Sequence, residues 1–229
     1  MNIGGLQKVS LLDYPDKIAT IVFTNGCCFR CGFCHNPGLV MPPFSSSVSE
    51  KEFLDYLDGR KGLLDAVVIT GGEPTLQSDL LEFMEKIKTR GLLIKLDTCG
   101  AFPKKVKESI DSGFVDYVAM DIKSTREEYE KVTNMPIVGG AIEESIALIL
   151  GSELPHEFRS TIVEGLHDEE KILAMAQMIE GANAYYLQQF RVAEEMNDNS
   201  FKGKKSLPKK ELEQIAKKCK KYVKMCDIR

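Results

Sequence analysis

The stretch Cys27-Cys28-Phe29-Arg30-Cys31-Gly32-Phe33-Cys34-His35-Asn36-Pro37 follows an apolar, β-branched run at residues 18–24. Three of its cysteines, Cys27, Cys31 and Cys34, have C-x3-C-x2-C spacing, which lets one short loop direct three thiolates to a common centre. Soft thiolates suit an iron–sulfur cluster or a zinc ion. In a four-iron cluster, three cysteines leave one iron without a protein ligand, and an open position is typical of a catalytic metal. The stretch therefore predicts a metal centre that binds a substrate or cofactor.

The rest of the chain alternates short apolar strands with amphipathic helices. We expect strands at residues 18–24, 66–70, 92–96, 115–120, 158–163 and 184–190. Strands that alternate with helices imply a parallel sheet with right-handed crossovers. A closed eight-unit barrel needs about 250 residues, and after residue 190 we expect one helix, at about 208–225, and no strand. The prediction is an α/β fold, a partial, open (β/α)6 TIM-like barrel with parallel strands, in a single domain 1–229 with its core at about 17–190.

Capping residues mark the helix starts. Ser49 with Glu52, and Thr125 with Glu128, have the spacing of capping boxes. Ser78 and Asp168 are expected to cap two further helices, which Gly91 and Gly181 end. Helices are also expected at 103–112 and 140–150.

Composition excludes several classes of function. The formal net charge of −4 gives no general argument for binding nucleic acid, and no apolar run reaches the roughly 20 residues that span a membrane. Seven cysteines are an odd number, and the start of the chain has no secretion signal, which disfavours a disulfide framework. We expect a cytoplasmic protein without nucleic-acid or membrane partners.

Polar residues follow each expected strand: the cysteine loop, Gly71-Gly72-Glu73-Pro74, Asp97-Thr98, Asp121 with Lys123, Glu164-Gly165, and Gln188-Gln189. The carboxyl ends of parallel barrel strands meet at one mouth, where active sites form. Asp121 and Lys123 lie two residues apart, so their side chains point the same way. The sequence predicts one polar ligand site facing the metal.

These residues support a resemblance. The cysteine stretch resembles the cluster loop of the radical S-adenosylmethionine (SAM) enzymes, and Cys34-His35-Asn36-Pro37 is similar to the signature of the glycyl-radical-enzyme activases. The lead-in Ser10-Leu11-Leu12-Asp13-Tyr14-Pro15 resembles that of activases of anaerobic ribonucleotide reductases, with Asp16 in place of their usual glycine.

The resemblance implies a reaction and its cofactors. It implies a 4Fe–4S cluster on the three cysteines, with SAM on the open iron, and reductive cleavage of SAM to a 5′-deoxyadenosyl radical. That radical would generate a glycyl radical on a partner enzyme, such as an anaerobic ribonucleotide reductase. A flavodoxin- or ferredoxin-type protein would supply the electron. No acid–base residue is required, since the cofactor carries the chemistry.

The resemblance also implies roles for individual residues. The segment from Gly71 to Glu73 would hold the methionyl ammonium, and Lys123 the carboxylate, with Asp121 ordering the site. Asp97 and Thr98 match a turn that binds a monovalent cation, although Cys99 replaces its asparagine. The residues expected to bind cofactor are Phe33, His35, Gly71, Gly72, Glu73, Asp97, Asp121, Lys123 and Arg159.

Alternatives remain at this point. Arg159 could instead pair with a carboxylate in the barrel. The radical core could act on a small molecule, as in 7-carboxy-7-deazaguanine synthase, or the cysteines could hold zinc in a non-catalytic metal or redox module with Cys99 as fourth ligand. His156 and His167 are predicted to be surface or core residues rather than ligands. The ten lysines between residues 202 and 224 indicate either a solvated face or a docking surface for an acidic partner.

Overall fold

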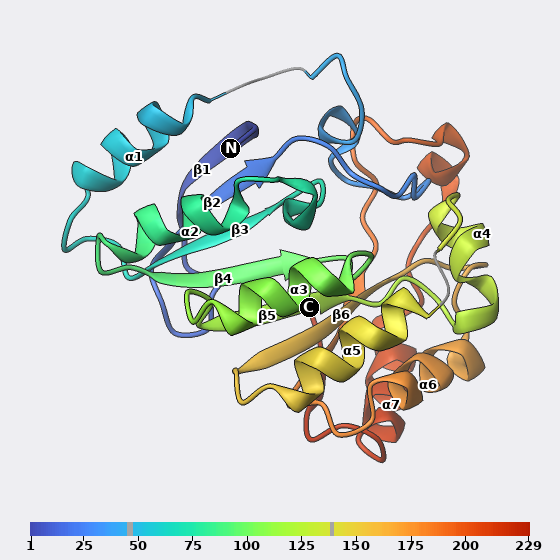
Figure 1. Ribbon diagram of the computed structural model, residues 1–229. Helices are drawn as coiled ribbons and strands as arrows, with labels where there is room; N and C mark the ends of the chain where they lie inside the picture. The colour runs from blue at the N-terminus through green and yellow to red at the C-terminus, as the bar shows by residue number, and fades with distance from the viewer. Residues whose placement is uncertain (45–47, 138–139) are drawn as a thin grey trace. The chain divides into compact units, whose positions relative to one another are not determined.

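A computed structural model describes residues 1–44, 48–137 and 140–229 (Figure 1). The chain divides into two compact units, and each is described by itself. The first unit comprises Met1–Cys28, Gly38–Thr98 and Phe102–Val118. The second comprises Phe29–Pro37, Cys99–Ala101 and Ala119–Arg229. The expected single domain stays a prediction.

The first unit is built on consecutive strands. Its elements are β1 (Ile3–Ser10), β2 (Ala19–Thr24), α1 (Glu50–Asp58), β3 (Ala66–Gly71), the 3-10 turn η2 (Pro74–Leu76), α2 (Leu80–Lys88), β4 (Leu93–Thr98) and α3 (Pro103–Asp111). The strands lie in the order β1-β2-β3-β4, with the start of β5 (Tyr117–Asp121) next. β2, β3 and β4 are parallel, and β1 runs antiparallel to β2. Parallel pairing places Thr24 beside Gly71, so the loops that follow β2 and β3 leave the sheet at the same edge.

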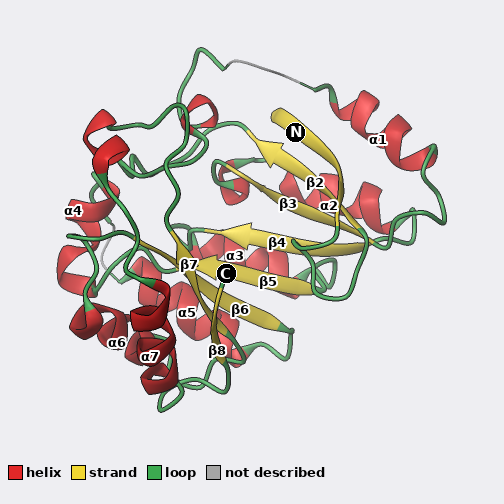
Figure 2. Ribbon diagram, turned by 180° about the vertical axis from the view of Figure 1, so that it is seen from behind, coloured by secondary structure: helices red, strands yellow, loops and turns green. Residues whose placement is uncertain are grey.

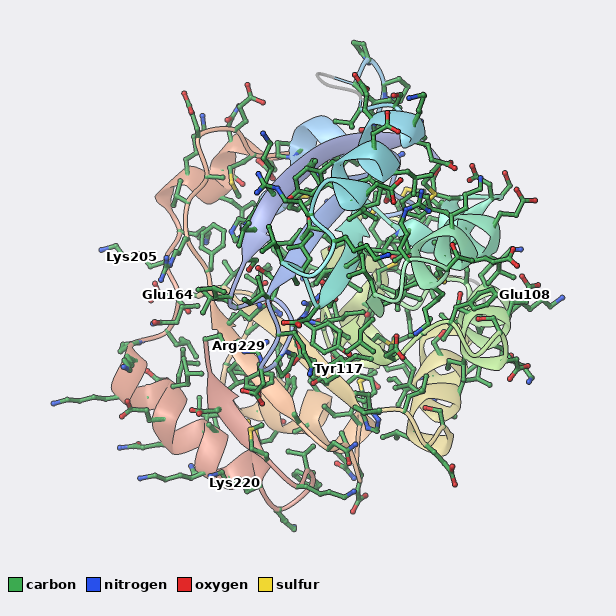
Figure 3. All side chains as sticks on the ribbon, turned by 90° about the vertical axis from the view of Figure 1, so that its left-hand side faces the viewer. Glu108, Tyr117, Glu164, Lys205, Lys220 and Arg229 are labelled. Carbon is green, nitrogen blue, oxygen red and sulfur yellow. The ribbon has the colours of Figure 1, made fainter. Side chains whose placement is uncertain are left out.

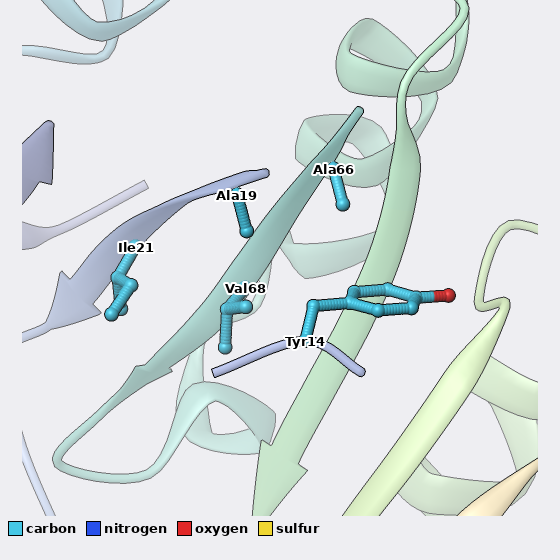
Figure 4. Packing of buried hydrophobic residues seen from close by; sticks show 5 residues of the cluster. All are labelled: Tyr14, Ala19, Ile21, Ala66 and Val68. Atoms are coloured by element: carbon cyan, nitrogen blue, oxygen red, sulfur yellow. The ribbon is translucent and has the colours of Figure 1, made fainter. Parts of the chain in front are cut away.

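Apolar side chains on one face of these strands form a small core cluster (Figure 4). Ala19 and Ile21 of β2 and Ala66 and Val68 of β3 are buried, as is Tyr14 from the loop before β2. The cluster combines the small side chains of Ala19 and Ala66 with the large ring of Tyr14. The lead-in segment therefore contributes to the core through Tyr14, whereas its Leu11 and Leu12 are exposed.

The second unit continues the pattern from the end of β5. Its elements are η3 (Arg126–Glu128), α4 (Tyr129–Thr133), α5 (Ala141–Gly151), β6 (His156–Ile162), α6 (Glu169–Met178), β7 (Tyr185–Gln189), η4 (Asn199–Gly203), α7 (Lys209–Cys219) and β8 (Cys226–Ile228). β6, β7 and β8 are parallel neighbours. Helices α6 and α7 lie side by side in both views (Figures 1 and 2).

The structure confirms two of the predicted caps and corrects two. Ser49 and Glu52 form the capping box of α1, and Asp168 accepts a hydrogen bond from the Lys171 amide at the start of α6. Ser78 is not the cap of α2, because Asp79 holds that position without a side-chain cap bond. The box at Thr125 and Glu128 was also wrong: Thr125 precedes a 3-10 turn, and the Glu128 carboxylate pairs with Lys171 at 2.7 Å.

The α/β fold with mostly parallel strands is as predicted, with two additional strands. The six expected strands correspond to β2 through β7. β1 was missed because its glycines weaken the strand signal, and β8 because a strand of three residues carries almost no pattern. The predicted last helix ran on to about residue 225, whereas α7 ends at Cys219. None of the described helices has the length and apolar character needed to cross a membrane.

Candidate functional site

The glycines after β3 allow a close approach between two backbones. The Gly72 amide donates to Thr24 O and the Glu73 amide to Gly26 O, both at 2.8 Å. A Cβ on Gly72 would lie 2.0 Å from the Gly26 carbonyl oxygen, and Gly71 has a φ of +117°. Only glycine fits both positions. The segment therefore lies directly beside the chain that leads into Cys27.

Glu73 is completely buried and organises this turn. Its Oε1 accepts hydrogen bonds from the Thr75 amide at 3.1 Å, from the Thr75 hydroxyl, and from the Thr98 hydroxyl at 2.7 Å. These three donors hold the Glu73 carboxylate in one orientation. The structure thus brings together two predicted site residues, Glu73 and Thr98, from the ends of β3 and β4.

Asp97 lies beside a buried lysine. The Lys95 ammonium is 3.6 Å from Asp97 Oδ1 and donates to the Asp13 carbonyl at 2.6 Å. Lys95 was not predicted as a functional residue, although a lysine inside an apolar strand, two residues before an aspartate, is a signal that could have indicated it. Asp97 therefore forms an ion pair with Lys95, and the monovalent cation expected at Asp97 and Thr98 stays a prediction.

In the second unit, helix α4 holds one side of the cysteine loop. The Arg30 amide donates to Thr133 O at 2.8 Å, and the Asn134 side chain donates to Arg30 O at 3.0 Å. Asn134 has a φ of +53°, a left-handed conformation that asparagine tolerates better than most residues. Phe29 packs edge-on against Tyr129, with ring centroids 6.3 Å apart. The loop is therefore attached to α4 through both backbone and side chains.

Asp121, Lys123 and Arg159 form one charged cluster, as the spacing of the first two predicted. Asp121 accepts from Lys123 Nζ and from Arg159 Nε, each at 2.9 Å. Burial alone would raise the pKa of Asp121, but Arg159 and Lys123 lower that pKa well below its ordinary value of 3.8. Burial would likewise lower the pKa of Lys123, but Asp121 and then Cys31 raise it well above 10.5. All three groups therefore stay charged at neutral pH, and of the two roles open for Arg159 the structure shows pairing with a carboxylate.

The charged cluster extends along the strands. Glu157 of β6 is completely buried and accepts two hydrogen bonds from the Arg229 guanidinium, both at 3.0 Å. Arg159 lies 3.9 Å from the same carboxylate. The Arg229 guanidinium also stacks on the Tyr186 ring, 3.4 Å from its centroid. Arg159 therefore lies within reach of two carboxylates, those of Asp121 and Glu157.

His167 has a structural role that the sequence did not reveal. It is 2 % exposed, its Nδ1 accepts from the Val163 amide at 3.0 Å, and its Nε2 donates to the Lys123 carbonyl at 3.0 Å. Burial lowers its pKa, so the ring is neutral and its tautomer is set by these two bonds. Of the two places predicted for His167, surface or core, the structure shows the core. His167 nevertheless contacts two predicted site residues, since its ring also packs edge-on against Phe33.

His35 contacts the segment after β7. Its Nε2 lies 2.7 Å from the Arg191 carbonyl oxygen, and its ring stacks on Phe190 at 5.8 Å. His35 is exposed, whereas Phe33 is buried. The two residues on either side of Cys34 therefore have different environments.

The cysteines of the loop differ in burial. Cys31 is buried, and Cys27, Cys28 and Cys34 are half-buried. Among the residues described, no three His, Cys, Asp or Glu side chains are arranged to hold a metal ion. Cys99, the fourth ligand of the zinc alternative, is buried. The metal ligation by Cys27, Cys31 and Cys34 stays a prediction from their spacing.

Comparison with known proteins identifies relatives over nearly the whole chain. Residues 21–178 match the radical SAM superfamily. The chain is 33% identical over 229 residues to a Methanocaldococcus jannaschii protein that carries the name of a glycyl-radical enzyme activating enzyme. That alignment covers 96% of this chain and 92% of the relative. A Listeria monocytogenes pyruvate formate-lyase-activating enzyme is 31% identical over 156 residues, 59% of this chain and 60% of that enzyme.

A solved structure shows the same fold. A radical SAM methyltransferase from Sphaerobacter thermophilus superposes with a TM-score of 0.74 over 94% of this chain and 67% of its own. The two sequences are 13% identical, so the likeness concerns the fold alone.

Proposed function

This chain belongs to the radical SAM superfamily, and we propose that it generates a glycyl radical on a partner enzyme. The observation that carries the proposal is the 33% identity to a glycyl-radical enzyme activating enzyme, because it extends over 96% of this chain and 92% of that one. The Cys34-His35-Asn36-Pro37 signature and the similarity to a pyruvate formate-lyase-activating enzyme support it. An anaerobic ribonucleotide reductase is the partner that the lead-in Ser10–Asp16 favours.

The donor set fits a 4Fe–4S cluster. Three thiolates on one loop suit iron, and a cationic neighbour favours the thiolate form that a ligand must take. Lys123 interacts electrostatically with Cys31 in the second unit and supplies that neighbour. We propose Cys27, Cys31 and Cys34 as the ligands. A bound cluster would supply the electron for reductive cleavage of SAM, the source of the 5′-deoxyadenosyl radical.

The chain's own residues would bind and orient SAM. Lys123, held by Asp121, would present an ammonium to the methionyl carboxylate, and Arg159 keeps Asp121 ionised. Gly71, Gly72 and Glu73 would receive the methionyl ammonium through their oxygen atoms, which can accept its hydrogen bonds. Glu73 is buried at this position. Phe33 and His35 would border the cofactor. The proposal includes a monovalent cation at Asp97 and Thr98, whose oxygens suit a hard ion.

Co-incubation with a glycyl-radical enzyme tests the function. The protein is first reconstituted with iron and sulfide, and then mixed anaerobically with a reductant, SAM and an anaerobic ribonucleotide reductase. We expect the doublet EPR signal of a glycyl radical. The doublet is expected because the 5′-deoxyadenosyl radical would take a hydrogen atom from a glycine Cα of the partner.

Omitting SAM provides the control and should abolish the doublet. If 5′-deoxyadenosine forms with the loaded protein while several glycyl-radical enzymes give no doublet, the proposed partner class is wrong and a small-molecule substrate replaces it.

The electron donor would dock on the lysine-rich segment 202–224. All ten lysines in this segment are exposed, against Glu211 and Glu213 of opposite charge. Figure 3 shows the side chains of Lys205 and Lys220 directed away from the ribbon. We propose an acidic flavodoxin- or ferredoxin-type donor because opposite charges steer association. Such a donor, and thiolate-ligated iron, suit a cytoplasmic location.

Reversing charges in this segment tests the docking surface. Changing Lys210, Lys217 and Lys220 to Glu should slow reduction by flavodoxin about tenfold at low salt, because the steering attraction becomes repulsion. Stopped-flow absorbance would measure the rate. Dithionite, a small reductant, should reduce both proteins equally. An unchanged flavodoxin rate would assign these lysines to a merely solvated face.

A further inference from the structure

A segment after β7 lies against the cysteine loop within the second unit. We call residues 196–205 the clamp segment. The Asn197 side chain donates to Cys31 O at 3.0 Å, and the Asp198 amide donates to Gly32 O at 3.2 Å. Two consecutive carbonyls of the cysteine loop thus accept hydrogen bonds from two consecutive residues of the clamp segment. The match in register shows that this contact is specific rather than incidental.

Phe201 adds an apolar contact to the same part of the loop. Its ring packs against Phe33, with centroids 5.9 Å apart, and a Cβ on Gly32 would lie 2.4 Å from Phe201 Cε2. The glycine between Cys31 and Phe33 therefore leaves the space that the Phe201 ring fills. On its other side Phe33 meets His167, at 6.5 Å between centroids. Phe33 is 4% exposed because these two rings enclose it.

The clamp segment is itself held in place. Asp198 caps η4 by accepting from the Ser200 amide at 2.8 Å, which fixes the direction of the chain that carries Phe201. Met196 is buried before it, and the Glu164 amide donates to Lys205 O at 2.8 Å after it. The contacts to Cys31 and Gly32 lie between two anchors, so the segment is not a loose loop that happens to touch the site.

We propose that the clamp segment positions Cys31 and Cys34 for metal binding, with Phe201 and Asn197 as positioning residues. The proposal deepens the proposed function and rests on it, since it assigns a role in holding the metal ligands. Three thiols bind one cluster only when they point to a common centre. A loop held by local hydrogen bonds alone would sample many other arrangements, and ordering it on metal binding would cost conformational entropy. Contacts with the clamp segment, which is distant in sequence, reduce that freedom and cover this side of the loop.

Alkylation of the cysteines in the cluster-free protein tests the clamp without requiring activity. Phe201→Ala should raise the rate at which iodoacetamide labels Cys31 and Cys34 about tenfold, corresponding to about 1.4 kcal/mol. Quantitative mass spectrometry of each cysteine peptide gives the rates. Phe201→Tyr keeps the ring and should restore the low rate. Phe114→Ala, which removes a half-buried phenylalanine of the first unit, is the matched control and should leave the rates unchanged.

Two internal comparisons separate loop opening from unfolding. Cys219 and Cys226 are 0% and 3% exposed, so global unfolding would raise their labelling as well. Gly32→Ala should raise Cys31 labelling in the natural protein by displacing the Phe201 ring, but should add little in the Phe201→Ala background, because the two changes disrupt one contact. Additive effects, or equal increases at Cys219, would overturn the proposal.

A second readout concerns the loaded protein. After reconstitution with iron and sulfide, Phe201→Ala should lose iron to a ferrous chelator several-fold faster than the natural protein and Phe114→Ala. An equal rate in all three would contradict a role in metal retention. If no variant binds a cluster, the proposed function fails, whereas the labelling result still decides whether residues 196–205 hold the loop.

Discussion

Replacing Cys34 by alanine is expected to abolish formation of 5′-deoxyadenosine from SAM. Three thiolates are the minimum protein ligation of a 4Fe–4S cluster with one open iron, and the loss of one leaves two open positions. Changes in the residues around metal ligands already cost about 10- to 100-fold in metal affinity, so loss of a ligand itself should cost on the order of 100-fold or more. Anaerobic reconstitution, followed by iron and sulfide analysis and chromatography of 5′-deoxyadenosine, measures both effects.

Cys28→Ala is the matched control, because Cys28 lies in the same loop but outside the C-x3-C-x2-C spacing. It should keep both the cluster and the product. If Cys28→Ala were as damaging as Cys34→Ala, the ligand assignment would be wrong. If zinc without iron accompanied the purified natural protein, the non-catalytic metal module would replace the radical enzyme.

Asp121→Asn is expected to give the largest loss of stability among single changes at the site. The carboxylate compensates the charges of Lys123 and Arg159, whose side chains are 18% and 12% exposed. Asparagine keeps the shape but removes the negative charge that bonds to both cations, although Arg159 keeps Glu157 at 3.9 Å. Breaking a buried pair costs about 3–5 kcal/mol, and because Asp121 is 28% exposed we expect a loss at the lower end of that range. Denaturant unfolding at pH 7 measures the change in the free energy of unfolding.

Asp55→Asn is the control, since the Lys51–Asp55 pair is 83% and 60% exposed and water screens such a pair, so the change should leave stability almost unaltered. The pH dependence has a defined sign. The lowered pKa of Asp121 means that its contribution is complete above its ordinary value of 3.8 and is lost as the pH falls through the lower folded value. The stability difference between Asp121→Asn and the natural protein should therefore shrink only in strong acid. A difference below 1 kcal/mol at pH 7 would show that the cluster is solvated like a surface pair.

Lys123→Met separates SAM binding, in which we propose that Lys123 takes part, from the stability of the Asp121–Lys123–Arg159 cluster. Without the lysine, Asp121 still pairs with Arg159 at 2.9 Å, so the fold should tolerate the change better than Asp121→Asn. We expect the smaller loss for Lys123→Met because it removes one of the two ion pairs of Asp121, whereas Asp121→Asn removes both.

The features that the sequence predicted correctly depend on residues close to one another in the chain. The strands β2 through β7 carry apolar residues in runs too short for helices, so their positions could be read directly. Ser49 and Asp168 cap their helices through bonds to residues three positions on, which spacing alone reveals. Asp121 and Lys123 pair because alternate residues of an extended chain share a side. The cysteine spacing belongs to the same class of information.

Tertiary contacts decided the rest. β8 is three residues long and is recognised by its pairing with β7, and α7 ends at Cys219 rather than running on to about residue 225. His167 looks like an ordinary loop histidine until its ring is found between Val163 and Lys123, 44 residues away. Asn197 and Phe201 lie more than 160 residues from the cysteine loop that they contact, and no local pattern marks them. Such contacts depend on packing between distant segments, whose free energy no short window of sequence contains. The sequence by itself determined the chemistry of this protein, and only the tertiary structure decided which residues hold the cysteine loop in place.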